Sequence, residues 1–136
     1  MDTSFSNSNL SNIQGKRVVL YLGRLWKDKG LDILPEAWKL VVDKVNNAVL
    51  VVAGPDYKEY RSIFMQRVSD LGISDRVFVP GPIYGEEKDA FLGIAKIFVL
   101  PSKSEGFSVS LLEAVGAGIS CIYSKECNFP DLARIG

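Results

Sequence analysis

The chain contains no histidine, the side chain most often used as a general base and as a metal ligand. Its two cysteines, Cys121 and Cys127, have a spacing that fits neither a zinc site nor a disulfide framework. We therefore expect reduced thiols and no bound metal ion. No stretch reaches the roughly 18 to 20 apolar residues that a membrane-spanning helix needs, and residues 1–14 lack the apolar segment of a signal peptide. These absences predict a cytoplasmic protein.

An excess of either charge is also missing, because 16 Lys and Arg residues balance 16 Asp and Glu residues. A general nucleic-acid-binding surface needs a basic excess, so we expect no nucleic-acid partner. The 136 residues suit one domain, and 47% of them are apolar, which is enough for a core. Because the first residues are rich in Ser and Asn, we expect a disordered leader or linker at 1–15 and a folded domain at 16–136.

Short apolar runs alternate with helical patterns along the folded part. The runs are continuously apolar, as in strands buried on both faces, and predict strands at 17–23, 48–53, 76–80, 96–100 and 119–123. Helical spacing and capping residues predict helices at 31–45, 57–71, 86–94 and 108–117, with the start of another at 129–135. This order is typical of an α/β fold with a doubly wound parallel sheet.

Ligands of such sheets bind outside the carboxyl ends of the strands, so the loops at 24–30, 54–56, 81–85 and 101–107 are where we expect function. In the first of them, Arg24 and Lys29 are five residues apart. A guanidinium fork together with an ammonium group suits a diphosphate. The alternative is that both are solvated surface charges.

The segment at 101–114 carries a stronger signal. Glu113 is the only charged residue between Glu105 and Lys125, and it lies in a helix that is otherwise apolar or small. Such a carboxylate needs a partner, and the hydroxyls of a ligand would serve. Ser108 is a candidate N-cap, so the backbone N–H groups of 106–109 would form an anion site. The alternative is that Glu113 pairs with a basic residue elsewhere and Glu105 is exposed.

These residues resemble a known family. Glu105 and Glu113, preceded by Pro101-Ser102 and followed by Ala114, resemble the E-x7-E signature of retaining GT-B glycosyltransferases of group 1. Gly23-Arg24 with Lys29-Gly30, and the segments 52–54 and 75–81, are similar to that family's segments in order and spacing. The resemblance covers about residues 16–132 and implies a Rossmann-like donor-binding domain of about five strands, one half of a GT-B architecture.

The resemblance also implies roles for single residues. Arg24 and Lys29 would hold the diphosphate of a UDP-, GDP- or ADP-sugar, and Glu113 would accept hydrogen bonds from its ribose. Glu105 would contact the donor sugar as the catalytic residue, and no metal or other cofactor is required. The remaining donor contacts would come from Gly54 and the loop from Val79 to Gly81, which would flank the base, and from the backbone of Gly106, Phe107, Ser108 and Val109. Tyr84 could line the same pocket, and the alternative for it is a packing role.

The chain departs from the family pattern at both ends. By the resemblance we expect the acceptor-binding N-terminal domain and the C-terminal stretch that completes the donor domain to be missing, and we expect a truncated domain that transfers no sugar alone. The acceptor, a sugar or a lipid, would bind through the missing domain, which would also mediate any peripheral membrane contact. Apolar surface left by the truncation predicts self-association. The alternatives are a non-catalytic nucleotide-binding or assembly module and a fragment of a GT-B sugar epimerase or phosphorylase.

Overall fold

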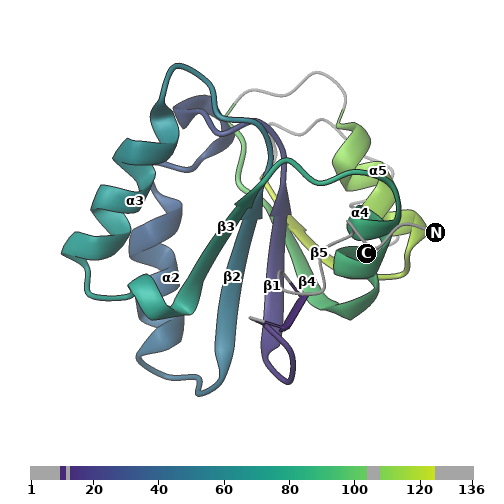
Figure 1. Cartoon of the computed structure of the whole chain (residues 1–136), viewed down its shortest axis with the longest axis horizontal. Coiled ribbons are helices and arrows are strands. Elements are labelled where there is room, and N and C mark those ends of the chain that lie inside the picture. Colours follow the sequence, from purple (N-terminus) through teal and green to yellow (C-terminus); the bar gives the residue numbers. More distant parts are fainter. Residues whose placement is uncertain (1–9, 12, 104–107, 125–136) are drawn as a thin grey trace.

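A computed structural model describes residues 10–11, 13–103 and 108–124 of the chain (Figure 1). Its strands are all parallel and form one sheet in the order β3-β2-β1-β4-β5. The strands are β1 (Arg17–Leu22), β2 (Ala48–Ala53), β3 (Val77–Gly81), β4 (Ala95–Leu100) and β5 (Ser120–Tyr123). The helices are α2 (Leu34–Val42), α3 (Tyr60–Asp70), α4 (Gly85–Ile94) and α5 (Val109–Gly116), with short 3₁₀ helices η1 (Lys27–Lys29) and η2 (Ser74–Arg76).

The two central strands carry the core. Every residue of β2 is buried, and in β1 Leu20 and Tyr21 are fully buried. A central parallel strand is covered on both faces by helices, which is why these runs are continuously apolar. Outer strand β5 alternates between exposed and partly exposed residues, because only part of its surface is covered.

Helices pack on both faces of the sheet (Figure 1). Helices α2 and α3 lie together on one side of it, and α4 and α5 lie on the other. Trp38 of α2 is almost fully buried, and its indole N–H donates to the Arg76 carbonyl over 2.9 Å. None of the helices that the structure describes combines the length and the apolar character needed to cross a membrane.

The α/β fold and the five parallel strands predicted from the sequence are confirmed, with differences at the ends of elements. Arg76, predicted as the first residue of a strand, ends η2 instead. Its guanidinium donates hydrogen bonds to the Ala48 carbonyl and the Val45 carbonyl, each over 2.7 Å. The first two long helices begin about three residues later than predicted, and the helix predicted at 129–135 lies outside the described residues.

The folded unit begins earlier than the boundary expected between residues 15 and 16. Ile13 is 1% exposed and belongs to the core, and the Gly15 carbonyl accepts a hydrogen bond from the Asn47 side chain over 2.8 Å. Composition gives no sign of this, because Ile13 is one apolar residue in a polar segment. Residues 1–9 and 12 lie outside the described residues, so the leader remains a prediction there.

Candidate functional site

Two glycines hold the loops together at the carboxyl edge of the sheet. Gly54 follows β2 with φ 154°, and a Cβ atom there would come within 1.7 Å of the Gly23 carbonyl oxygen. Gly30 has φ 80°, and a Cβ atom there would lie 2.0 Å from the Pro101 carbonyl oxygen. Only glycine permits these approaches, so the loops after β1, β2 and β4 meet at one place.

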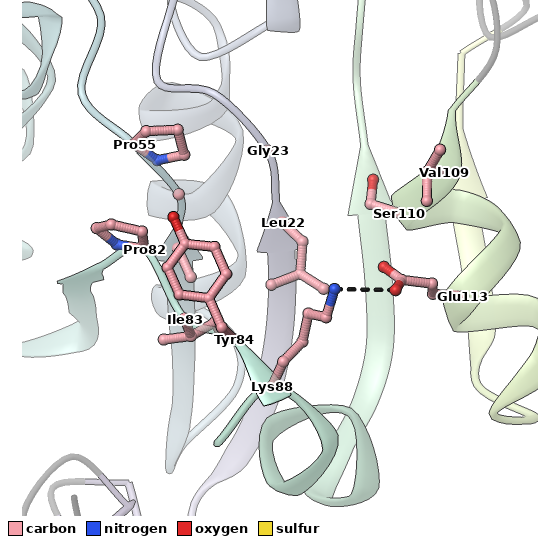
Figure 2. Close-up of a pocket in the computed structure, with 12 residues that line it drawn as sticks. Leu22, Gly23, Pro55, Pro82, Ile83, Tyr84, Lys88, Val109, Ser110 and Glu113 are labelled. Atoms are coloured by element: carbon pink, nitrogen blue, oxygen red, sulfur yellow. Dashed lines mark hydrogen bonds and ion pairs between the residues drawn. The ribbon is translucent and has the colours of Figure 1, made fainter. Parts of the chain in front are cut away.

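Two adjoining hollows open at this edge. The first, the Arg24 hollow, has a volume of about 280 Å³ and is lined by Arg24, Lys29 and Ser108 among others. The second, the Glu113 hollow, has a volume of about 220 Å³ and is lined by residues of α4, α5 and the loops after β2 and β3 (Figure 2). Both are smaller than the roughly 300–1,000 Å³ of typical ligand pockets. They share four lining residues, namely Leu22, Gly23, Val109 and Ser110. Because the two hollows adjoin, one elongated ligand could occupy both.

Arg24 is held from two sides. Its backbone carbonyl accepts a hydrogen bond from the buried Tyr21 hydroxyl over 2.7 Å. Its guanidinium carbon lies 4.8 Å from the centre of the Tyr57 ring, and that ring makes an edge contact with Trp26 at 5.0 Å between centroids. A cation–π contact does not use up the N–H donors of a guanidinium, so they can still bind an anion. The structure therefore brings Arg24 and Lys29 to one hollow, as the sequence predicts.

The N-terminus of α5 closes the other side of the Arg24 hollow. Ser108 is 4% exposed and caps the helix, its hydroxyl oxygen accepting from the Leu111 N–H over 3.0 Å. The N-cap expected at Ser108 is confirmed, and Val109 and Ser110 face both hollows. A helix N-terminus beside two cationic side chains favours an anionic ligand.

Glu113 has a protein partner, which is the alternative that the sequence left open. Its Oε2 atom lies 2.9 Å from the Nζ atom of Lys88, with side-chain exposures of 35% and 28% respectively. Figure 2 shows the Lys88 side chain pointing toward Glu113, and both residues line the Glu113 hollow. A carboxylate can accept about four hydrogen bonds, so this pairing leaves Glu113 capacity for a ligand.

The rest of the Glu113 hollow is mainly apolar. Pro55, Pro82, Ile83 and the 72%-exposed Tyr84 form the side opposite α5 (Figure 2). Gly54 lines the hollow as expected. Val79 and Gly81, which were also expected to flank a base, do not line it, because β3 extends through them to its end at residue 81 and Val79 faces the core. An apolar wall opposite a carboxylate suits a flat ring that carries hydroxyl groups.

The structure leaves some expected residues undescribed and adds others. Glu105, Gly106 and Phe107 lie outside the described residues, so their roles remain predictions. Lys88, Pro55, Pro82 and Ile83 were not singled out from the sequence, whereas Tyr84 was named as a possible lining residue and lines the Glu113 hollow. The one signal for Lys88 is that it is the only basic residue of α4, and this signal has meaning only once α4 is known to face α5.

Cys121 is partly buried, and burial raises the pKa of its thiol. Because the thiolate is the reactive form, this shift disfavours nucleophilic chemistry at Cys121. Cys127 lies outside the described residues.

The chain has clear relatives. Residues 4–136 match the model of the family described as glycosyl transferases group 1. The 2-deoxystreptamine N-acetyl-D-glucosaminyltransferase of Niallia circulans is 28% identical over 136 residues, which cover 100% of this chain and 34% of that relative. The chain spans between about a quarter and a third of the length of the first curated relatives it matches.

Solved structures share the fold. The C-terminal domain of the group 1 glycosyl transferase LpcC from Francisella tularensis superposes with a TM-score of 0.76 at 23% identity, covering 96% of this chain and 73% of that domain. The Anabaena protein HepE, in complex with UDP and glucose, gives a TM-score of 0.75 at 19% identity, covering 92% of this chain and 36% of that one.

Proposed function

The chain belongs to the group 1 glycosyl transferases and has the fold of the C-terminal domain of their GT-B architecture, and from this premise we propose that it binds the nucleotide-sugar donor. The reaction would be retaining transfer of a hexosyl group from a nucleoside-diphosphate sugar to an acceptor. A sugar or a lipid acceptor would bind to the other half of the architecture. The enzyme would work in the cytoplasm, at the membrane face where the acceptor is a lipid.

One observation supports this most: the two adjoining hollows differ in chemistry in the way that the two halves of a nucleoside diphosphate differ. The Arg24 hollow combines Arg24, Lys29 and the N-terminus of α5, which suits the diphosphate. The Glu113 hollow combines an apolar wall with a carboxylate, which suits a base and a ribose. The complex of HepE with UDP and glucose is consistent with such a ligand on this fold.

The same groups suit the chemistry of a transfer without a metal ion. A retaining transfer must stabilise the departing nucleoside diphosphate, whose charge grows as the glycosidic bond breaks. Arg24, Lys29 and the N–H groups at the start of α5 would stabilise that charge. Glu105 would orient the sugar or stabilise its developing positive charge. Binding of the diphosphate should accordingly be unchanged by EDTA.

Calorimetric titration of the chain with UDP, GDP and ADP tests the proposal. We expect one of them to bind, and Arg24→Ala and Glu113→Ala each to weaken it by about tenfold or more, as for a lost charge-assisted hydrogen bond. Arg17→Ala is a matched control, because Arg17 is exposed at the opposite, amino end of β1. If a folded chain binds none of the three at millimolar concentration, the donor-site proposal fails.

The Lys88–Glu113 pair is the one observation that favours a different function. A module that had kept the fold and lost the reaction would satisfy Glu113 internally, as Lys88 does here. Such a module, used for assembly only, would bind no nucleotide and would be insensitive to Glu113→Ala. The same titration separates the two functions.

A further inference from the structure

Lys88 and Glu113 stand out on their two helices. Lys88 is the only basic residue of α4, whose sequence also holds three acidic residues. Glu113 is the only charged residue of α5. These two charges, 25 residues apart, meet at 2.9 Å across the Glu113 hollow (Figure 2), where both belong to the lining.

The pair contributes little to holding the helices together. Both side chains remain about a third exposed, and an ion pair at that level of exposure adds little to stability. Core residues such as Phe91 and Leu92 on α4, and Leu111 and Ala114 on α5, anchor the two helices instead. A role in the site explains the pairing better than a role in folding.

The geometry suits orientation of the carboxylate. Lys88 occupies one side of Oε2, and a carboxylate has about four acceptor positions over its two oxygens. The ammonium group restrains Oε2 from the α4 side. Leu22, Ser110 and the apolar wall line the rest of the hollow. A diol entering there would donate to a carboxylate whose orientation is already set, which saves the entropy of ordering it on binding.

We propose that Lys88 is a positioning residue for the ribose of the donor. It holds the Glu113 carboxylate ready to accept hydrogen bonds from the 2′ and 3′ hydroxyls, and it balances the carboxylate charge when a base covers the hollow and excludes water. This inference rests on the proposed function. It adds a residue from α4, outside the loop after β1 and the 101–114 segment, to the determinants of donor specificity.

The test compares ribose with 2′-deoxyribose. The full chain is titrated with UDP, GDP and ADP and with their 2′-deoxy forms, and the ratio of the two dissociation constants measures discrimination for the base that binds. We expect about tenfold discrimination in the wild type, little in Lys88→Met, and a return toward the wild-type ratio in Lys88→Arg. Lys88→Met should have no further effect in the Glu113→Ala background. Lys96→Met is the matched control, because Lys96 is exposed near the amino end of β4.

Other outcomes are distinguishable. Tighter binding of the ribonucleotide by Lys88→Met would mean that Lys88 competes with the ribose, and it would overturn the inference. If Lys88→Met weakens binding of the ribonucleotide and the deoxyribonucleotide equally, Lys88 contacts the base or phosphate directly. That result would also overturn the inference. If the wild type binds but the ratio is unchanged in Lys88→Met, only this inference fails. If the wild type binds none of the nucleotides, the proposed function fails with it.

Discussion

The Arg24 hollow draws its cationic side chains from one loop, whereas the Glu113 hollow draws its charges from two helices. Arg24 and Lys29 lie in the segment directly after β1, five residues apart. Lys88 and Glu113 come from α4 and α5 and meet only because both helices pack on the same face of the sheet. The difference teaches that a group built from one loop is visible as a motif, while a group built across helices is visible only in the fold.

The largest effect is expected from a change that damages both hollows together. Gly54→Ala would bring a Cβ atom to 1.7 Å from the Gly23 carbonyl oxygen, and Gly23 lines both hollows. We expect a loss of at least about 2 kcal/mol in the free energy of unfolding, with nucleotide binding also reduced. Chemical denaturation measures it. Gly72→Ala is the control, because Gly72 also has a positive φ, 72°, but a Cβ atom there meets nothing within 4 Å. An equal loss in both variants would contradict the argument from close approach.

Arg24→Ala should separate the two hollows. We expect it to weaken a bound nucleoside diphosphate by roughly 10- to 100-fold, as for a lost charge-assisted contact. The matching nucleoside, which has no phosphate, should bind both proteins equally weakly. Calorimetry or competition with the diphosphate measures both. A comparable loss for the nucleoside would show that Arg24 shapes the Glu113 hollow as well.

Ser108→Ala tests the helix that borders both hollows. Removing the hydroxyl leaves the buried Leu111 N–H without its acceptor, so we expect a loss of about 1 kcal/mol in unfolding free energy. Ser108→Thr should keep most of the stability, because threonine also caps a helix. Denaturant unfolding followed by circular dichroism gives the values. Equal stability of the alanine and threonine variants would mean that the cap is not needed.

Tyr57→Leu should give the smallest effect, and it sharpens the account of the Arg24 hollow. The substitution removes the ring on which the Arg24 guanidinium lies. An exposed cation–π contact is worth about 0.5 to 1 kcal/mol, so we expect diphosphate affinity to fall about two- to fivefold. Tyr57→Phe keeps the ring and should bind as the wild type does. If the phenylalanine variant is as weak as the leucine variant, the Tyr57 hydroxyl and not its ring supports the site.

The sequence predicted the fold well, because the signals for it are local. Continuous apolar runs such as Ala48–Ala53 become central strands, and Ser108 is recognisable as a cap from its position before an apolar helix. The ends of the elements were less predictable, as at Arg76, whose guanidinium donates to the Val45 and Ala48 carbonyls, and at Ile13, which is buried in the core. No local pattern carries that information.

In the candidate site, too, some features are predictable from the sequence and others only from the fold. The residue types in the loop after β1 and the spacing of Glu105 and Glu113 are written in the sequence, and they indicated an anion site and a carboxylate. The sequence also offered two partners for Glu113, a ligand hydroxyl or a basic side chain, and had no means to choose between them. Tertiary structure supplied Lys88, because the packing of α4 beside α5 sets that distance. It also brought Pro55, Pro82, Ile83 and Tyr84 together as an apolar wall. These residues share a surface only because the parallel strands that precede them end at one edge of the sheet.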